Sequence, residues 1–355
     1  MHLSVMLGLL ANEKSLARET PLVRFPLPSD WNIELYLKDE SALPSGSLKH
    51  RLARSLIIHG LIEGRIDPGT TLVDASSGST AVSEAWFARL LGLTFVAVVP
   101  RNVSPDKVRL IESFGGTVEF ARDAVDACAL AAKLGSQSGW YFLDQFALAS
   151  IATDWRADNV AAELFDQLRD ERFPVPHWIV VGAGTGGTSA TIGRYCRYTA
   201  RATRLAVVDP ENSAYYEAWT TGRSDVTAAG SLIEGIGRPS VEKSFVPHAI
   251  DEMLAVEDAH SVAAMQLIAE RTALRTGPST GTNLVGALVL VDRMLRNGES
   301  GSVVTLACDA GDRYSETFYS ADWLRANGID PNEATEHIRS FIGPVESSIV
   351  DELVV

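Results

Sequence analysis

The sequence is short of basic residues. Lys and Arg together number 31 against 45 Asp and Glu, which gives the 355-residue chain a formal net charge of −14. Proteins that bind the phosphate backbone of nucleic acid or an anionic membrane surface usually present a basic patch. The acidic balance therefore argues against nucleic acid and membrane partners. It does not exclude a small anionic ligand, because a few backbone amides bind an anion locally.

Cysteine and long apolar runs are also scarce. The chain has three cysteines, far apart and without a Cys-x-x-Cys pair: Cys128, Cys196 and Cys308. This usage is typical of a reducing compartment, so we expect a cytoplasmic protein without a metal site. No stretch approaches the roughly 20 apolar residues that a membrane-spanning helix requires. The segment Met1–Leu10 is apolar but lacks the basic start and the cleavage pattern of a signal peptide.

Hydrophobic residues make up 46% of the chain and alternate between strand-like runs and helical spacing. The pattern predicts strands at Ile33–Lys38, Thr71–Val73, Thr94–Val99, Thr117–Phe120, His177–Val181, Arg204–Val208 and Ser302–Leu306. It predicts helices at Leu48–Gly60, Thr80–Leu91, Pro105–Phe114, Asp123–Leu134, Gly187–Tyr195, Glu257–Ala273 and Asn283–Leu295. Apolar strands separated by helices indicate parallel sheets covered on both faces. The expected fold is α/β with two doubly wound, mostly parallel sheets.

Two stretches lack clear periodicity. We predict that Phe146–Asp158 is an irregular crossing between the two halves of the chain. Asp209–Pro247 holds four glycines, at positions 222, 230, 235 and 237, and is long for a plain connection. Long irregular stretches in compact proteins are often functional, so this one is a candidate active-site loop.

A glycine-rich run directly follows the strand predicted at His177–Val181: Gly182-Ala183-Gly184-Thr185-Gly186-Gly187-Thr188. Glycines let the backbone approach a phosphate closely, and the amides of a helix N-terminus bind it. The run contains no lysine, which excludes a Walker loop. The spacing of Gly182, Gly184 and Gly187, with Asp209 about 20 residues further on, also fits a dinucleotide-binding turn. The sequence predicts a phosphate site and leaves a nicotinamide-dependent oxidoreductase as an alternative.

Lys49 stands at the start of a predicted helix, after the small polar run Pro44-Ser45-Gly46-Ser47. A cation at a helix N-terminus opposes the helix dipole, which lowers the pKa of the amine. A neutral amine attacks a carbonyl and forms a Schiff base. On these residues alone, a solvated surface lysine remains the simpler interpretation.

Two further runs of small residues precede helices. Ser76-Ser77-Gly78-Ser79-Thr80 offers hydroxyls and amides to a carboxylate, or serves as an ordinary helix cap. Gly277-Pro278-Ser279-Thr280-Gly281 matches the nucleophile elbow of hydrolases, and Asp309 and His337 follow in the order of a triad. An elbow requires a preceding strand, whereas Glu257–Ala273 is predicted to be helical. We therefore expect Ser279 to hydrogen-bond a ligand instead of acting as a nucleophile.

In this order, the four motifs resemble those of the fold-type-II pyridoxal-phosphate enzymes, the cysteine synthase and cystathionine β-synthase family. The resemblance spans about residues 20 to 330 and implies a tryptophan synthase β-like fold with the active site between two domains. Other segments are most similar to the L-cysteine desulfhydrase branch: Asp39–Ser41, Ala152–Arg156, Val208–Ser213 and Cys308–Tyr314. The resemblance also implies a homodimer. We place a smaller inserted domain at residues 38–150 and a larger domain at residues 1–37 and 151–345.

The resemblance implies roles for individual residues. Lys49 would bind pyridoxal 5'-phosphate as a Schiff base and remove the substrate's α-proton. The cofactor would also contact Ser79, Ser279 and the phosphate-binding residues Gly184, Thr185, Gly186, Gly187 and Thr188. The substrate would meet the flexible loop of Gly235-Ile236-Gly237, and its carboxylate would bind Ser77, Gly78, Ser79, Thr80 and Gln145.

Two residues depart from the usual cysteine synthase pattern. Ser79 replaces an Asn that contacts the cofactor's 3-oxygen, and His50 replaces an Asp after the lysine. The expected reaction is β-elimination on L-cysteine, which gives sulfide, pyruvate and ammonia. The alternative is β-replacement, in which O-acetylserine and sulfide give cysteine. An NAD(P)-dependent oxidoreductase and a catalytically silent amino-acid binder are more remote interpretations.

Overall fold

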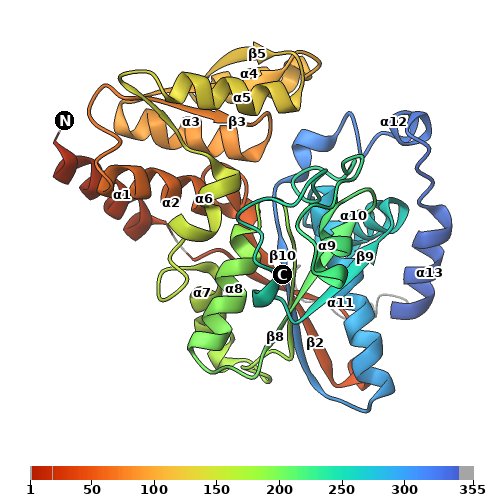
Figure 1. Cartoon of the computed structure of the whole chain (residues 1–355). Helices are drawn as coiled ribbons and strands as arrows, with labels where there is room; N and C mark the ends of the chain where they lie inside the picture. The colour runs from red at the N-terminus through yellow and green to blue at the C-terminus, as the bar shows by residue number, and fades with distance from the viewer. Residues whose placement is uncertain (1, 18, 344–355) are drawn as a thin grey trace, which may run out of the picture.

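The computed structural model describes residues 2–17 and 19–343 and confirms the α/β class with two mostly parallel sheets (Figure 1). The larger sheet has the order β1-β2-β10-β7-β8-β9, and β1 pairs with β2 in the antiparallel direction. Its strands are β1 (Leu22–Phe25), β2 (Ile33–Asp39), β7 (Trp178–Gly182), β8 (Arg204–Pro210), β9 (Glu252–Val256) and β10 (Gly301–Ala307). The smaller sheet, β5-β4-β3-β6, is wholly parallel. It consists of β3 (Thr71–Ala75), β4 (Thr94–Pro100), β5 (Thr117–Ala121) and β6 (Trp140–Phe142).

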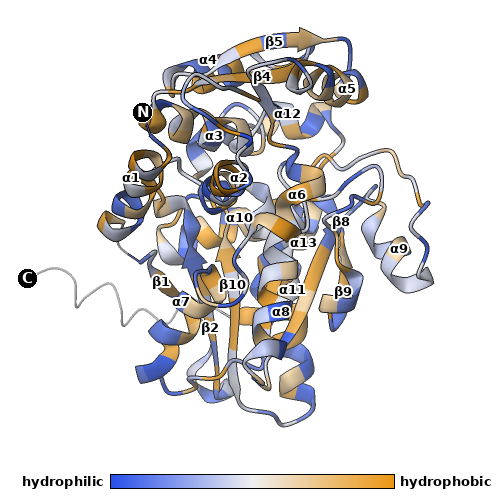
Figure 2. Ribbon diagram, turned by 60° about the vertical axis from the view of Figure 1, so that its left-hand side comes forward, coloured by the Kyte–Doolittle hydropathy of each residue, from blue (hydrophilic) through white to orange (hydrophobic). Residues whose placement is uncertain are grey.

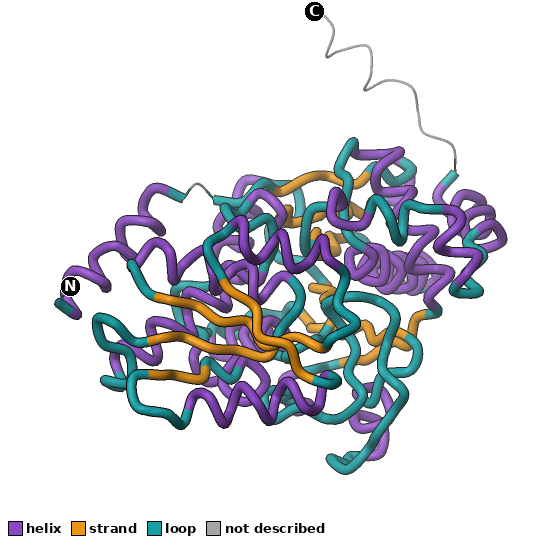
Figure 3. Tube along the Cα trace, turned by 90° about the horizontal axis from the view of Figure 1, so that it is seen from above, coloured by secondary structure: helices purple, strands orange, loops and turns teal. Residues whose placement is uncertain are grey.

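Helices cover both faces of the larger sheet. One face packs against α10 (Asp258–Thr272), α11 (Pro278–Arg296) and α13 (Asn332–Ile342), and the other against α7 (Val160–Gln167) and α8 (Gly187–Tyr198). In Figure 3 the orange strands lie side by side, with purple helices around them. Figure 2 shows β8 and β10 as largely hydrophobic ribbons. The central strands β2, β7, β8 and β10 are buried on both faces and form largely apolar runs, which is why the sequence predicted them. The edge strands β1 and β9 are partly exposed and were not predicted.

The smaller sheet has its own apolar core. It lies between α2 (Lys49–Ile62) with α3 (Ser79–Leu91) on one side and α5 (Ala124–Gly135) on the other. Three further helices add to these cores: α4 (Pro105–Ser113) buries Ile111 in that of the smaller sheet, α9 (Tyr215–Thr221) buries Tyr215 in that of the larger sheet, and α12 (Ala321–Ala326) buries Leu324 against α10. No helix among residues 2–17 and 19–343 is both long and apolar enough to cross a membrane.

The first helix, α1 (Leu3–Leu16), was not predicted. It buries Met6 and Leu10 in the core of the smaller sheet, although the sequence placed residues 1–37 with the larger domain. The same division assigned residues 344 and 345 to the larger domain, and these lie outside the described residues. α1 packs on the smaller unit through contacts with α2 and α3, which are distant from it in sequence.

The prediction of an irregular segment at Phe146–Asp158 was wrong in its first half, because α6 spans Gln145–Ala152. Asp144 caps this helix, and its side chain accepts a hydrogen bond from the Ala147 amide. The helix packs against α2 on one side and α8 on the other, so that apolar residues occupy most of its circumference. A helix that is apolar all round shows no amphipathic period. In Figure 1, α6 lies between the two sheet units.

Candidate active site

Lys49 is the first residue of α2, as the sequence predicted, and it lies in the cleft between the two sheet units. The cleft cavity on the side of the smaller sheet has a volume of about 380 Å³. It is lined by Lys49, the Ser76–Thr80 loop and the segment Ser231–Arg238. Parallel sheets place ligands at the carboxyl ends of their strands, and both sheets contribute loops of this kind here.

Burial lowers the pKa of Lys49 below its ordinary value, and the nearby Arg238 guanidinium acts in the same direction. The negative charge of Asp309 opposes this shift. The backbone beside the lysine is held in place, since the Leu48 amide donates to the Cys308 carbonyl at 2.8 Å. The result is an amine that is neutral more often than an exposed lysine and that faces the cleft.

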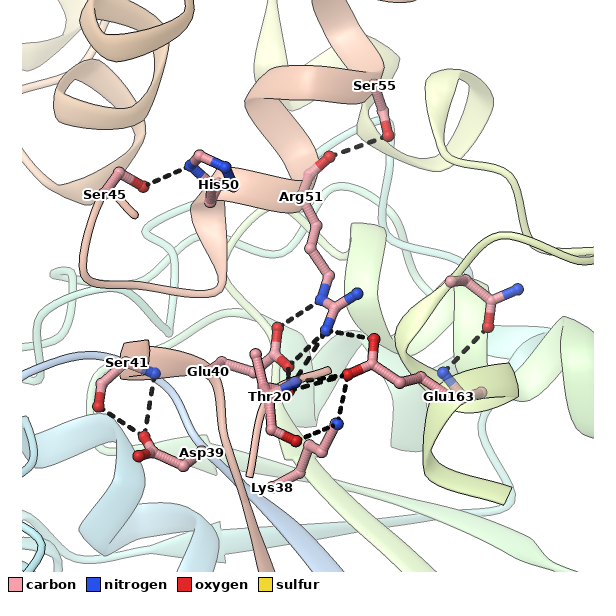
Figure 4. A network of polar contacts seen from close by, with 12 residues as sticks. Thr20, Lys38, Asp39, Glu40, Ser41, Ser45, His50, Arg51, Ser55 and Glu163 are labelled. Carbon is pink, nitrogen blue, oxygen red and sulfur yellow. Dashed lines mark hydrogen bonds and ion pairs between the residues drawn. The ribbon is translucent and has the colours of Figure 1, made fainter. Parts of the chain in front are cut away.

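A buried ion-pair network anchors the helix that carries Lys49 (Figure 4). Arg51 Nε donates to Glu40 Oε2 at 2.6 Å, and Arg51 Nη2 lies 2.8 Å from Glu163 Oε2. Lys38, whose side chain is fully buried, pairs with the same Glu163 carboxylate. Because β2, α2 and α7 all contribute to the network, it fixes the first turn of α2 to the larger sheet unit.

The glycine run forms the turn between β7 and α8. Gly186 has φ +86°, and a Cβ atom there would lie 2.6 Å from the Ser244 carbonyl oxygen. A Cβ atom on Gly184 would overlap the Gly235 carbonyl. The amides of Gly187 and Thr188 stand at the start of α8, where helix N–H groups have no intrahelical acceptor. The turn is therefore a cradle of backbone amides that tolerates no side chain at Gly184 or Gly186.

Ser279 lies on the first turn of α11, is 3% exposed and lines the same cavity as Lys49 and Gly184. α11 begins at Pro278, earlier than predicted, because Gly277 and Pro278 start the helix directly. The residues before the motif belong to α10 and a short loop, so the strand that a nucleophile elbow requires is absent there. His337 packs against His260 and does not line the cavity that holds Ser279 and Asp309. The hydrolase triad is not assembled.

The Ser76–Thr80 loop connects β3 to α3, and Gly78 is the N-cap. Thr80 Oγ1 donates to Gln145 Oε1 at 2.8 Å, and Gln145 Nε2 donates to the Ala75 carbonyl at 3.4 Å. Ser77, Gly78, Ser79, Thr80 and Gln145 all line the cavity. The geometry brings together all of the residues for which the sequence implied a carboxylate site.

Sequence reasoning missed a group of side chains that follows β10. Asp309 is 5% exposed and lines the cavity with Lys49 and Ser279. Tyr314 donates to Asp309 Oδ2 at 2.6 Å, and Arg313 Nη1 donates to Ser79 Oγ at 2.5 Å. Burial raises the pKa of Asp309, while the Arg313 charge and the Tyr314 hydrogen bond oppose that shift. The segment Cys308–Tyr314 was noted as a motif, but its sequence alone does not indicate that it faces the lysine.

Cys308 lies among these residues. Its amide donates to Thr280 Oγ1 at 3.0 Å, and Asn283 Nδ2 donates to its sulfur at 3.3 Å. Burial raises the pKa of the Cys308 thiol to about 12, so the sulfur is a neutral packing group beside Ser279. Cys308 is therefore a small core residue.

Asp209, the residue that a dinucleotide site would use for a ribose, is buried to 1% exposure. Its Oδ2 accepts the Tyr216 amide at 2.7 Å, next to the start of α9. Burial raises the pKa of Asp209 to about 6. A carboxylate this deeply buried is not accessible to a ribose, which argues against the oxidoreductase alternative.

Comparisons with known proteins place the chain in a family. The family model described as pyridoxal-phosphate dependent enzyme matches residues 14–309. The chain is 54% identical over 319 residues to an L-cysteine desulfhydrase of Mycobacterium tuberculosis, covering 88% of this chain and 87% of that protein. It is 32% identical to a putative cysteine synthase of Sinorhizobium fredii, covering 90% and 94%. The crystal structure of an O-acetylserine dependent cystathionine β-synthase from Helicobacter pylori superposes with a TM-score of 0.73 at 27% identity, covering 86% and 96%.

Proposed function

Because this chain belongs to the pyridoxal-phosphate dependent enzyme family, we propose that it is a lyase that cleaves L-cysteine by β-elimination. The products are sulfide, pyruvate and ammonia, and one water is consumed. The observation that carries the proposal is the 54% identity, over 88% of the chain, to an L-cysteine desulfhydrase. Ser79, at a position where cysteine synthases usually have Asn, is consistent with a reaction other than cysteine synthesis.

The residues of the cleft fit the groups of pyridoxal phosphate. The Lys49 amine, with its lowered pKa, suits the aldehyde. The amide cradle of Gly184, Thr185, Gly186, Gly187 and Thr188 suits the phosphate, because a Cβ atom would fill it. The neutral Ser279 hydroxyl suits the ring nitrogen. We propose these residues, together with Ser79, as the cofactor contacts.

When bound, pyridoxal phosphate supplies a carbonyl for amine attachment and a conjugated ring that accepts electrons from the substrate's Cα. Lys49 takes the proton as the Cα–H bond breaks, and the electron pair of the Cβ–S bond leaves with the sulfur. Ser279 carries no negative charge to hold a proton on the ring nitrogen, which weakens the ring as an electron acceptor. A ring that accepts electrons less strongly favours rapid loss of the leaving group from Cβ over a long-lived carbanion.

The substrate carboxylate has a defined place in this proposal. The Ser77 hydroxyl and the backbone amides of Ser77, Gly78, Ser79 and Thr80 face the carboxylate, and Gln145 accepts a hydrogen bond from the Thr80 hydroxyl. Gly235, at φ +90°, belongs to the segment that covers the opposite wall of the cavity. We propose that this segment closes the site around the amino acid and excludes water.

The test is to supply each substrate separately to the purified enzyme. Cysteine alone should give sulfide and pyruvate in equal amounts, and Lys49→Ala should abolish both products. The alternative, β-replacement, is supported by the putative cysteine synthase relative. Cysteine formation from O-acetylserine and sulfide at a much higher rate than pyruvate formation would overturn the lyase proposal. A protein that binds cysteine without turnover would instead be a silent binder.

We propose further that the chain forms a homodimer. Helix α1 leaves Leu3, Val5 and Leu16 exposed by 47%, 49% and 74%, which is apolar surface suited to a second copy. Sedimentation should give twice the monomer mass, and Leu3→Asp with Val5→Asp should shift the mass to that of a monomer. We also propose a cytoplasmic location, consistent with three free cysteines, which subcellular fractionation tests.

A further inference from the structure

The Arg313 guanidinium lies between two loops of the site. It belongs to the short helical turn Gly311–Tyr314 that follows β10. Its Nη1 donates to Ser79 Oγ at 2.5 Å, and its Nη2 donates to the Ser45 carbonyl at 3.4 Å. Gly46 has φ +74°, and a Cβ atom there would lie 3.2 Å from Nη2. The loop that precedes Lys49 is thus shaped around this guanidinium.

The hydrogen bond from Arg313 determines what Ser79 can do. A guanidinium has only donors, so Ser79 Oγ must act as the acceptor in that contact. The Ser79 hydroxyl proton is then available to a different partner. The acceptor nearest to it is Asp309 Oδ2 at 3.5 Å, a long contact to an oxygen that already accepts from Tyr314 at 2.6 Å. Ser79 is therefore a hydrogen-bond donor whose proton lacks a short acceptor among the described residues.

The cavity beside Ser79 is where an acceptor would lie. Ser79, Lys49 and Gly184 line it together, with the glycine run contributed by the larger sheet unit and Ser79 by the smaller one. On the pyridine ring of the cofactor, the aldehyde that meets the lysine stands between the phosphate arm and the 3-oxygen. With its phosphate at the glycine run and its aldehyde at Lys49, the ring would carry its 3-oxygen on the side of the lysine away from the glycine run, and Ser79 is the residue that we propose for that side.

We propose that Arg313 is a positioning residue that makes Ser79 a hydrogen-bond donor to the 3-oxygen of the bound cofactor. This inference rests on the proposed cofactor site, but not on which reaction follows. A donor at that position stabilises the deprotonated, negatively charged 3-oxygen. Arg313 and the short Ser79 side chain together thereby provide the hydrogen bond that the longer Asn side chain provides by itself in cysteine synthases.

The test is the absorption spectrum of the purified holoenzyme across pH, since protonated and deprotonated 3-oxygen forms absorb in different bands. Arg313→Gln and Ser79→Ala should each shift the band ratio toward the protonated form, by roughly tenfold for the loss of one charge-assisted hydrogen bond. If Arg313 acts through Ser79, the double variant should shift no further than Ser79→Ala alone. A double variant whose shift equals the sum of the two single shifts would overturn the inference.

Two variants separate positioning from a merely structural role. In a Ser79→Asn background the amide provides its own donor, so adding Arg313→Gln should leave the spectrum unchanged. Arg313→Lys keeps a donor-only cation and should retain most of the wild-type band ratio even if Arg313→Gln folds poorly. Arg275→Gln removes a neighbouring exposed arginine, paired with Asp312, and should have no effect.

The outcomes distinguish this inference from the proposed function. A holoenzyme that cleaves cysteine, with a spectrum insensitive to Arg313→Gln, overturns the inference and leaves the lyase proposal intact. A holoenzyme with the expected spectral shifts but no cysteine cleavage supports the inference and contradicts the lyase proposal. A protein that takes up no pyridoxal phosphate overturns both.

Discussion

The Thr80 hydroxyl donates a 2.8 Å hydrogen bond to the Gln145 side chain and so joins the first turn of α3 to the first residue of α6. Both residues are buried, at 3% exposure each. Gln145 Nε2 in turn donates to the Ala75 carbonyl at the end of β3. One amide side chain therefore ties both ends of the proposed carboxylate loop to a helix that also packs against the larger sheet unit.

Replacing Gln145 with Ala should weaken substrate binding more than it slows turnover. The Thr80 hydroxyl would lose its acceptor, and an unsatisfied buried polar group costs about 1–3 kcal/mol. We expect KM for cysteine to rise roughly ten- to hundredfold, with a smaller change in kcat. Steady-state kinetics measures this, with the exposed Gln137→Ala as the matched control. A fall in kcat at unchanged KM would contradict the positioning role of Gln145.

Replacing Gly184 with Ala should reduce cofactor affinity. The added Cβ would overlap the Gly235 carbonyl, so the amide cradle and the segment opposite must separate. We expect the dissociation constant for pyridoxal phosphate to rise at least tenfold, measured by absorption titration of the apoenzyme. Gly8→Ala, in α1 with open space around it, should leave the affinity unchanged and stabilise the fold by about 0.5–1 kcal/mol. Equal affinity in both variants would show that the cradle is not the phosphate site.

Cofactor uptake by the apoenzyme should become faster as pH rises and then level off below the ordinary lysine value of 10.5. Only the neutral amine attacks an aldehyde, and burial lowers the pKa of Lys49, so the neutral form is reached at a lower pH. The appearance of the cofactor's visible absorption gives the rate at each pH. Asp309→Asn removes a negative charge near Lys49 and should move the plateau to still lower pH. A rate that climbs without a plateau up to 10.5 would contradict a buried, perturbed lysine.

Asp74 and Glu84 form a buried carboxyl pair beneath the Ser76–Thr80 loop, and both side chains are fully buried. Burial raises the pKa of each, and the negative charge of Asp74 raises that of Glu84 further. The folded protein thus keeps a proton that the unfolded chain has released above the ordinary glutamate value of 4.5. Stability should consequently fall as pH rises through the interval between that value and the raised one.

Glu84→Gln should remove the contribution of Glu84 to this pH dependence, because an amide holds its hydrogens at every pH. Between pH 5 and pH 8, we expect the free energy of unfolding to fall by on the order of 1–3 kcal/mol less in the variant than in the wild type. The raised pKa values of Asp74 and Asp209 leave a residual pH dependence in both proteins. The exposed Glu112→Gln is the matched control and should follow the wild type. If the Glu84 variant shows the same loss as the wild type, the pair does not hold a proton in the folded state.

Much of the fold was predictable because its determinants are local. The central strands of the larger sheet are buried on both faces and appear as unbroken apolar runs, as in Val303 and Val304 of β10. α6 was missed for the opposite reason: Ala149 and Ser150 are buried by α2 and α8 from two sides, which removes the amphipathic pattern. Its existence follows from the packing of the two sheet units and not from a helical repeat.

The site divides in the same way. The sequence by itself determined the amide cradle from Gly184 to Thr188 and the position of Lys49 at a helix start, because both depend on neighbours within a few residues. Only the tertiary structure decided that Arg313 and Asp309 face Ser79, which precedes them by more than 200 residues. A polar contact over that separation leaves no periodicity or spacing in the chain. It exists because the carboxyl ends of β3 and β10 meet across one cleft, where burial makes each hydrogen-bond partner matter.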